Sequence, residues 1–403
     1  MCIRDRNGPI EDRIVTTIHS GFLDTINKNK QVQIAGSLYS DWLLGDTKNE
    51  FKALLDQSSP VDAVFVQSNE LTVEVIEALK EMELNLPLVT ASKYLSDRYL
   101  TYMDLGEINS IVYTPVGGKE AVDYAIEILH KPSDRNALPK RIMKKSSMVN
   151  SENKETYRYH NSQEFEGKIG YIETNLFTES NMDDLFKEFG EVIFYEMDEY
   201  IDSHEREGLQ KEYFEKLIEE NVDLIIMRPE TSSGWQPFID QAKEKQISII
   251  CIGNAPYMND ELMDSNVFYI GPDFLDQGKK LATYLIQEVY STSYDIGIFE
   301  ITNDNDMQMS YEKTKSLNAQ ISGYSRINII DSVEINTTDS LNIEDQYEQL
   351  SESLTKYKTD INVIYLHDAM NVNKIKSILE DHGLNNVVII SSNDSGVVQT
   401  NTT

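Results

Sequence analysis

The sequence predicts an α/β fold with parallel sheets, and a stretch in the middle of the chain carries the evidence. Two short apolar runs rich in β-branched residues, Leu224–Met227 and Ile247–Ile252, each give way to polar residues with Gly or Pro. Buried parallel strands end in this way where they meet loops. Between the runs, Phe238 and Ala242 lie four residues apart, on one face of a helix. Strand, helix and strand form a βαβ unit, and ligands of such sheets bind beyond the carboxyl ends of the strands.

The composition is that of an ordinary globular protein. The 403 residues suffice for two or three domains, and the content of 40% apolar and 26% charged residues is typical of folded proteins. The formal net charge of -32 repels phosphate backbones and anionic lipids, which argues against nucleic acid or a membrane surface as partner. A second interpretation is that the acidity only keeps the protein in solution.

Cysteine usage and hydropathy exclude further classes. Cys2 and Cys251 are too few for a disulfide framework or a metal cage, and we expect Cys251 to be a buried core thiol. No apolar run approaches the roughly 18 residues of a spanning helix, so the protein is not expected to be membrane-embedded. The charged start, MCIRDRNGPIEDR, is no signal peptide, so either the protein is cytosolic or its true start is missing.

Strands and helices alternate on both sides of the central stretch. Before residue 167 the pattern predicts strands at Val32–Ala35, Ala63–Val66, Leu86–Thr90 and Ser110–Tyr113, and a helix at Lys119–Leu129. After residue 290 it predicts strands at Ile296–Ile301, Ile327–Ile330, Val363–Leu366 and Val387–Ile390, with helices between them. Residues 133–166 are polar and are expected to form an end-of-domain tail and a linker.

Three motifs connect the chain to a known family: a strand followed by Pro and SSGW, the strand ISIICIGN, and the run VFYIGPDFLDQGKKLA. Tyr269–Asp273, followed by Gly278, matches a "Val-Gly-x-Asp, four residues, Gly" element. In these features the chain resembles the type I periplasmic sugar-binding proteins of ABC transporters. The resemblance implies an α/β fold of two lobes, each a three-layer αβα sandwich around a Rossmann-like parallel sheet.

A repeat predicts how the lobes are arranged. Residues Asp62–Leu84 align without gaps to Asn362–Leu384, at an offset of 300, so the second lobe occurs twice and a circular permutation is disfavoured. We therefore expect a tandem, incomplete array, a fragment cut at both ends. Its parts are the back of a first copy (9–153), a linker (154–166), the first lobe of a second copy (167–290) and a truncated second lobe (291–403). The helix Lys119–Leu129 then lacks a sheet of its own and must dock elsewhere or remain exposed.

No catalytic constellation is apparent. The sequence has no GxSxG, Walker A, HExxH or CxxC motif, and its six histidines show no ligand spacing. We therefore expect no enzyme, and no cofactor or metal.

Polar and aromatic residues at predicted strand ends suit a neutral polyol, because hydroxyl groups need planar donors and acceptors and a sugar ring needs an aromatic cover. The candidates in the second copy are Asn175, Arg228, Trp235 and Asn254 from the first lobe, and Asn303, Asp368 and Asp394 from the second. The resemblance implies a ligand-binding Asp at position 394, which makes it the strongest candidate.

These residues also have structural interpretations. Trp235 alternatively anchors the start of a helix, Asn254 caps a turn, and Arg228 pairs with Glu230 at the surface. Asp394 alternatively forms a turn in the tail. For Asp273 and Gly278, a capping or hinge role is favoured over ligand contact.

The first copy departs from the family pattern. Its corresponding residues are Asn69, Ser92 and Tyr113, and Ser92 stands where the family has an Asp. Loss of that acidic acceptor puts sugar binding by the first copy in doubt or shifts it to a different ligand.

The resemblance thus predicts an extracytoplasmic solute-binding protein that captures a small polar ligand, most simply a sugar or polyol. The lobes close by hinge motion, and the ligand passes to an ABC transporter permease. One alternative is a ligand-sensing ectodomain of a signalling receptor or histidine kinase. Another is a transcription regulator of the repressor type, which needs a basic helix-turn-helix that the linker does not show.

Overall fold

The computed structural model divides the chain into two compact units, each of which is considered separately. Unit 1 comprises Met1–Gly118, Lys144–Glu164 and Thr178–Glu188, and unit 2 comprises Lys119–Met143, Phe165–Phe177 and Phe189–Thr403. The described residues are 2–7, most of 19–39, 47–56, 61–92, 95–115, 117–130, 138–158, 165–172, 189–197, 203–256, 266–289, 295–302, 307–335, 343–367, 372–393 and 396–401.

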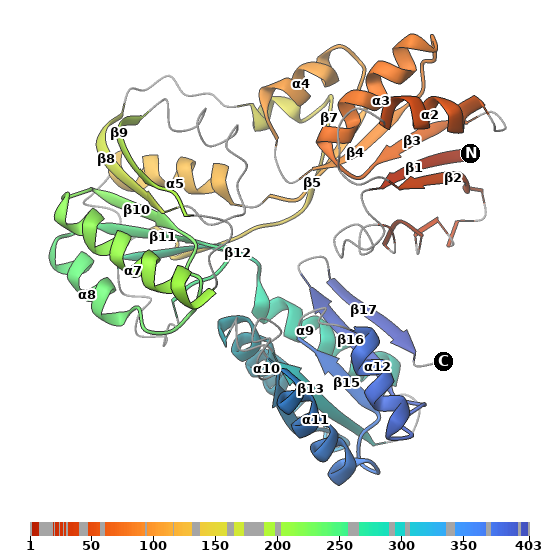
Figure 1. Ribbon diagram of the computed structural model, residues 1–403, viewed down its shortest axis with the longest axis vertical. Coiled ribbons are helices and arrows are strands. Elements are labelled where there is room, and N and C mark those ends of the chain that lie inside the picture. Colours follow the sequence, from red (N-terminus) through yellow and green to blue (C-terminus); the bar gives the residue numbers. More distant parts are fainter. Residues whose placement is uncertain are drawn as a thin grey trace. The chain divides into compact units, whose positions relative to one another are not determined.

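Unit 1 is built on one sheet, sheet A, with strand order β2-β1-β3-β4-β5-β7 (Figure 1). Neighbouring strands are parallel except β7, which runs antiparallel to β5. The strands are β1 (Cys2–Asn7), β2 (Gln33–Tyr39), β3 (Ala63–Val66), β4 (Leu88–Ser92), β5 (Ser110–Tyr113) and β7 (Ser147–Asn150). The helices described in this unit are α2 (Thr47–Asp56), α3 (Asn69–Glu81), α4 (Asp97–Asp104) and the 3-10 helix η2 (Lys154–Tyr157).

The predicted strands of unit 1 are present, and two more strands join them. β1 pairs with both β2 and β3, although its charged sequence gives no strand signal. β7 and η2 arise from the segment for which the polar composition predicts a tail and a linker. β7 pairs with β5, a strand distant in sequence, and thereby becomes the last strand of sheet A.

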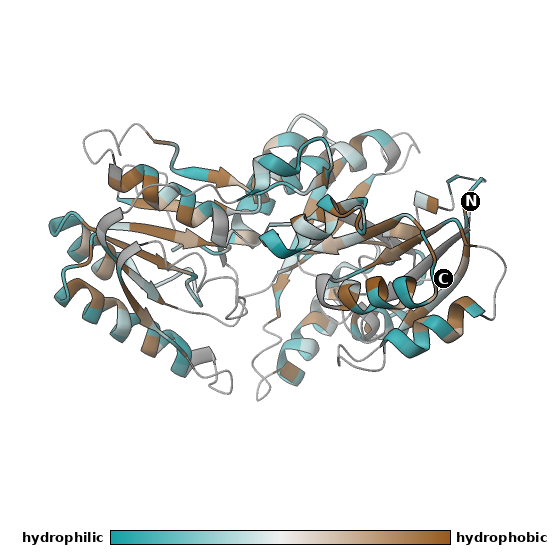
Figure 2. Ribbon diagram, turned by 90° about the horizontal axis from the view of Figure 1, so that it is seen from above, coloured by the Kyte–Doolittle hydropathy of each residue, from teal (hydrophilic) through white to brown (hydrophobic). Residues whose placement is uncertain are grey.

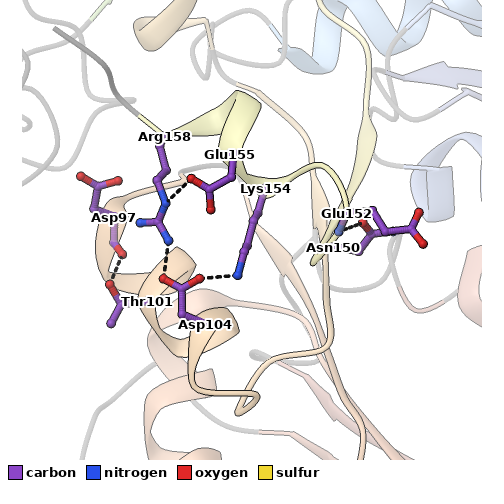
Figure 3. A network of polar contacts seen from close by, with 8 residues as sticks. All are labelled: Asp97, Thr101, Asp104, Asn150, Glu152, Lys154, Glu155 and Arg158. Carbon is purple, nitrogen blue, oxygen red and sulfur yellow. Dashed lines mark hydrogen bonds and ion pairs between the residues drawn. The ribbon is translucent and has the colours of Figure 1, made fainter.

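An ionic cluster on α4 holds the segment after β7 (Figure 3). The Asp104 carboxylate accepts hydrogen bonds from Lys154 and Arg158, and Arg158 also donates to Glu155 at 3.0 Å. The hydrogen bonds from Lys154 and Arg158 hold the pKa of Asp104 below its usual range. This stabilising contribution is therefore present above the ordinary carboxyl pKa and is lost as the pH falls through the lowered pKa.

Unit 2 contains sheet B, with strand order β6-β12-β11-β10-β8-β9, in which all neighbouring strands are parallel (Figure 1). Its strands are β6 (Arg141–Met143), β8 (Phe165–Ile172), β9 (Phe189–Tyr195), β10 (Leu224–Met227), β11 (Ser248–Ile252) and β12 (Val267–Gly271). The helices described around it are α5 (Gly118–His130), α7 (Ser203–Glu219) and α8 (Gln236–Glu244). Figure 2 shows hydrophobic residues concentrated in the strands, consistent with the complete burial of β10, β11 and β12.

Helix α5 contains the predicted helix Lys119–Leu129, and its apolar face is buried rather than exposed. Ala121, Ala125 and Ile128 are buried, and the ring of Tyr124 contacts Phe268 of β12 edge-on, with centroids 5.6 Å apart. Strand β6, from the same segment, pairs with β12. The helix thus docks on sheet B, and the segment 118–143 completes that sheet.

Unit 2 also contains sheet C, with strand order β14-β13-β15-β16-β17, in which β17 is antiparallel and the other neighbours are parallel. Its strands are β13 (Ile296–Thr302), β14 (Ile327–Glu334), β15 (Val363–Leu366), β16 (Val388–Asn393) and β17 (Gly396–Asn401). The helices are α9 (Phe274–Tyr284), the π-helical turn η4 (Leu285–Val289), α10 (Met307–Ile321), α11 (Ile343–Tyr357) and α12 (Val372–Asp381). Residues of α9 and α10 share one core cluster with the sheet, and residues of α11 and α12 share another.

Helix α9 packs with sheet C, so the lobe that contains sheet B ends at β12 rather than at residue 290. Leu281 and Ala282 of α9 lie in one core cluster with Ile298 of β13. Asp273 caps α9, accepting a hydrogen bond from the Asp276 backbone at 2.9 Å. Only Pro272 and Asp273 separate the end of β12 from the start of the helix.

The first four strands of sheets A and C have the same topology: the second, first, third and fourth strands in chain order lie side by side, as β2-β1-β3-β4 and as β14-β13-β15-β16. Strands β3 and β15 have bounds that differ by the offset of the sequence repeat, Ala63–Val66 and Val363–Leu366. None of the described helices is long and apolar enough to cross a membrane.

The crossing of α9 and α10 predicts that Gly278 tolerates no side chain. A Cβ atom at Gly278 would overlap Ser316 Oγ and the Lys313 carbonyl oxygen, and the backbone carbonyl cannot rotate away. We expect Gly278→Ala to lower the free energy of unfolding by about 1–3 kcal/mol, measured by urea denaturation. Gly208→Ala is the matched control, because Gly208 lies in α7 with open space around it and should gain about 0.5–1 kcal/mol. Equal effects of the two substitutions would contradict the close crossing.

The ionic cluster of unit 1 predicts that Asp104→Asn loosens the segment after β7. We expect amide hydrogen exchange of residues 150–158 to become several-fold faster at neutral pH, where the carboxylate is charged. Glu152→Gln, which removes a carboxylate in the same segment that carries no ion pair, should leave exchange unchanged. Similar exchange in the Asp104 variant and the unmodified protein would show that other contacts hold the segment.

Candidate functional site

Two of the predicted ligand residues meet at the carboxyl edge of sheet B. Arg228 is the first residue after β10, and Asn254 is the second residue after β11. Met227 pairs with Cys251 in the parallel register, so the two strand ends are adjacent. Between them lies Gly253, where an added Cβ would stand 3.4 Å from Arg228 Nε. With φ of +77°, Gly253 adopts a backbone conformation that favours glycine and leaves room for the guanidinium group.

Hydrogen bonds fix the backbone of this edge. The Tyr269 hydroxyl is 3.1 Å from the carbonyl oxygens of Gly253 and Pro272, which ties the turn after β11 to the end of β12. Asn254 Nδ2 donates to the Pro229 carbonyl oxygen at 3.2 Å. Asn254 therefore holds the turn, as its structural interpretation predicts, at a position beside Arg228.

A buried glutamine that sequence reasoning missed clamps the loop after β10. Gln210, on α7, donates from Nε2 to the Arg228 carbonyl oxygen at 2.7 Å and accepts at Oε1 from the Glu230 backbone at 2.8 Å. Its side chain is fully buried, which is rare for an uncharged amide unless both of its polar atoms are used. A Gln among polar residues of a predicted helix gives no signal of this role, because its partners lie 18 and 20 residues away.

Burial is the main influence on the pKa of the acidic residue in this loop, Glu230. Burial raises the pKa of Glu230, and the positive charges of Arg206 and Arg228 oppose this rise without cancelling it. Arg206 Nη1 lies 3.8 Å from Glu230 Oε1. The Arg228 guanidinium thus stands near one partly buried carboxyl group at the edge of the sheet.

Trp235 lies in the core of the lobe and offers no open ring face. It is 1% exposed, and Phe214 and Phe238 contact it with ring centroids 5.8 Å away. Its Nε1 donates to the Thr231 carbonyl oxygen at 2.9 Å. These contacts place Trp235 in the anchoring role at the start of α8, where it is the N-cap residue.

The other candidates after residue 167, Asn175, Asn303, Asp368 and Asp394, lie outside the described residues. Next to Asp368, however, stands a buried polar network that the sequence did not indicate. His367 Nε2 lies 3.1 Å from Glu300 Oε1, and Thr314 Oγ1 donates to both Glu300 carboxylate oxygens at 3.1 Å. Lys313 Nζ donates to the His367 carbonyl oxygen at 2.6 Å.

This network is electrically balanced when His367 is neutral. Burial lowers the pKa of His367, and the hydrogen bond to Glu300 only partly offsets that effect. The ammonium group of Lys313 and the carboxylate of Glu300 then compensate each other in a region where both side chains are almost completely buried. The network fixes the end of β15, directly before Asp368.

In unit 1, Ser92 and Tyr113 are register partners in β4 and β5. Both are buried, and the Tyr113 ring contacts Tyr157 edge-on at 6.0 Å between centroids. Asn69 is the first residue of α3, behind the N-cap Ser68, and its side chain is outside what the structure describes.

No group of three or more His, Cys, Asp or Glu residues within the described ranges could hold a metal ion. Cys251 is a free thiol in the core, and burial raises its pKa. The prediction of a buried core thiol at position 251 is confirmed.

The family model described as "Periplasmic binding protein domain" matches residues 169–399, more than half of the chain. The chain belongs to this family. The family consists of extracytoplasmic solute-binding proteins rather than enzymes, so the predicted type I fold and the absence of an enzymatic activity are confirmed. The match begins in β8 and ends in β17, and so includes sheets B and C.

No curated protein matches the chain. Among solved structures, a galactofuranose binding protein is 15% identical, with 56% of this chain and 76% of that chain covered and a TM-score of 0.40. An ABC transporter solute binding protein from Bacillus halodurans C-125 with bound myo-inositol is 15% identical, with 57% and 76% covered and a TM-score of 0.42. A periplasmic ribose ABC transporter protein from Conexibacter woesei DSM 14684 is 13% identical, with 56% and 72% covered and a TM-score of 0.40.

The core position of Trp235 predicts a stability effect. Trp235→Phe removes the hydrogen bond to the Thr231 carbonyl and should cost about 1–3 kcal/mol, whereas Trp235→Ala should cost about 3–5 kcal/mol. Denaturant unfolding followed by circular dichroism measures both. Gln236→Ala is the control. Gln236 is the exposed neighbour of Trp235, and its side-chain amide donates a hydrogen bond to Asp240, so its loss should cost about 0.5 kcal/mol or less. Unchanged stability of Trp235→Ala would contradict an anchoring role.

Proposed function

We propose that the lobes built on sheets B and C form a solute-binding module that captures a small polar ligand, a sugar or polyol, between them. The observation that carries the proposal is the convergence of Arg228 and Asn254 at the carboxyl edge of sheet B, within a family of solute-binding proteins. Ligands of open parallel sheets bind beyond this edge.

The chemistry of the edge supports a neutral, hydroxyl-rich ligand. The Arg228 guanidinium offers several donors in a fixed plane, and Gly253 leaves space beside it. Because the chain carries a net charge of -32, long-range electrostatics favour an uncharged ligand over a phosphate or a carboxylate. Asn175, Asn303, Asp368 and Asp394 remain proposed contacts, with Asp394 as an acceptor for paired hydroxyl groups.

We infer further that sheet A belongs to a first copy of the module in tandem. The shared strand order of sheets A and C and the repeat at an offset of 300 support this. The corresponding residues in the first copy are Asn69, Ser92 and Tyr113. Ser92 and Tyr113 are buried, and Ser92 replaces the acidic acceptor of the family. This copy is therefore the weaker candidate for sugar binding.

The proposed cellular role is delivery of the captured ligand to an ABC transporter permease from an extracytoplasmic location. The family relationship supports this role. Closure of the two lobes on the ligand would supply the signal that the permease reads.

Isothermal titration calorimetry with D-ribose, D-galactose, L-arabinose and myo-inositol tests the proposal. We expect at least one of them to bind, and Arg228→Met and Asp394→Asn to weaken it by about 10- to 100-fold, because each removes a charged hydrogen-bonding group. Arg326→Met is the control: it removes a cation paired with Asp295 just before β14 begins, at the amino edge of sheet C, and should bind normally. Absence of binding by the folded protein, or unchanged binding by both variants, would overturn the proposed function.

A further inference from the structure

A chain of polar contacts connects the edge of sheet B to helix α10 of the neighbouring lobe. The Ala255 backbone, one residue after Asn254, donates to Gln308 Oε1 at 2.9 Å. Gln308 Nε2 in turn donates to Glu312 Oε1 at 3.3 Å, one helical turn further along α10. Glu312 Oε2 accepts from Arg141 Nη2 at 2.8 Å. The contacts therefore run from the candidate ligand edge to strand β6.

These contacts are shielded from water. Gln308 and Glu312 are 6% and 9% exposed, and Ala255 is completely buried. Hydrogen bonds and ion pairs in such a setting are screened much less than those at the surface. The Arg141 guanidinium also lies over the Tyr269 ring, 5.2 Å from its centroid, and Tyr269 is the residue whose hydroxyl holds Gly253.

These contacts lie beside the covalent link between the two lobes, so they can restrict rotation about it. β12 ends at Gly271 and α9 begins at Phe274, so Pro272 and Asp273 alone join sheet B to the helix that packs on sheet C. A rotation about this link would separate Ala255 and Arg141, which belong to the sheet B lobe, from α10. Conformations with other lobe angles therefore lose the polar contacts.

We propose that Arg141, Glu312 and Gln308 form a hinge anchor that restricts the angle between the two lobes of this module and thereby sets its affinity for ligand. The statement about affinity rests on the proposed function. Arg141 acts through strand β6, so the segment before residue 144 takes part in regulating the module that follows it. The three side chains do not themselves contact the ligand in this proposal. They are positioning residues, because they fix the turn at Gly253 and the link at Pro272.

Interlobe distance distributions test the anchor without any ligand. Spin labels at Glu244→Cys in α8 and Glu352→Cys in α11 mark exposed positions of the two lobes, in a full chain with Cys2→Ser; the buried Cys251 stays unlabelled. We expect Arg141→Met, Glu312→Gln and Gln308→Ala each to broaden the distribution measured by double electron–electron resonance. Lys168→Met is the matched control, because it removes a cation whose ion pairs, to Glu191 and Glu220, do not involve α10.

Titration of the same variants with D-ribose, D-galactose and myo-inositol tests the link to affinity. Each substitution should weaken binding about three- to tenfold, because fewer molecules occupy the binding-competent lobe angle. Arg141→Met combined with Glu312→Gln should lose less than the product of the two single losses, since both remove one interaction.

Narrow, unchanged distributions in all three variants would overturn the anchor, as would a lysine control that broadens equally. Broadened distributions in a protein that binds none of the sugars would support the anchor and reject the sugar-binding proposal. Unchanged sugar affinity despite broadening would overturn the part of the inference that concerns binding.

Discussion

The apolar faces of sheet B impose the constraint on which the rest of the unit depends. Strands β10, β11 and β12 are buried along their whole length, so both faces need a helical layer. Helices α7 and α8 pack on one face, and α5 lies on the other (Figure 1). Burial of side chains such as Tyr124 and Ile128 contributes about 1.5–3 kcal/mol each. This explains why the segment Lys119–Met143, although it lies between two parts of unit 1 in the sequence, belongs to unit 2 and completes sheet B.

The same parallel arrangement builds the candidate site. Parallel strands end at one edge, so the residues after β10 and β11 become neighbours even though they are 26 positions apart, as Arg228 and Asn254 are. Hydrogen bonds between backbone groups and the side chains of Tyr269 and Gln210 hold both turns before any ligand arrives. A preorganised edge reduces the entropy lost on binding, which raises affinity without further contacts.

The second lobe combines close helix packing with buried charge. Gly278 lets α9 and α10 approach until a methyl group would no longer fit, and this brings Lys313 into the core, where it donates to the His367 carbonyl. The buried Lys313 ammonium is tolerated because Glu300 carries the opposite charge nearby, hydrogen-bonded to His367 and Thr314. Helix α10 therefore has two polar faces with different roles: Lys313 and Thr314 serve its own sheet, whereas Gln308 and Glu312 reach Ala255 and Arg141.

The sequence by itself determined the parallel α/β architecture and the family, because these follow from local periodicity and short motifs. The bounds of Ala63–Val66, Ser110–Tyr113, Leu224–Met227 and Val363–Leu366 are confirmed residue by residue, since short β-branched runs between polar turns leave little freedom. Periodicity could not tell a ligand-facing tryptophan from an anchoring one. The tertiary structure assigned Trp235 to the core through Phe214 and Phe238.

Only the tertiary structure also decided the partners of α5 and β6, the place of α9 with sheet C, and the roles of Gln210, Arg141 and Lys313. Each of these depends on contacts between residues far apart in sequence. The energy of such a contact depends on which surfaces meet in space, and local sequence patterns do not encode this information.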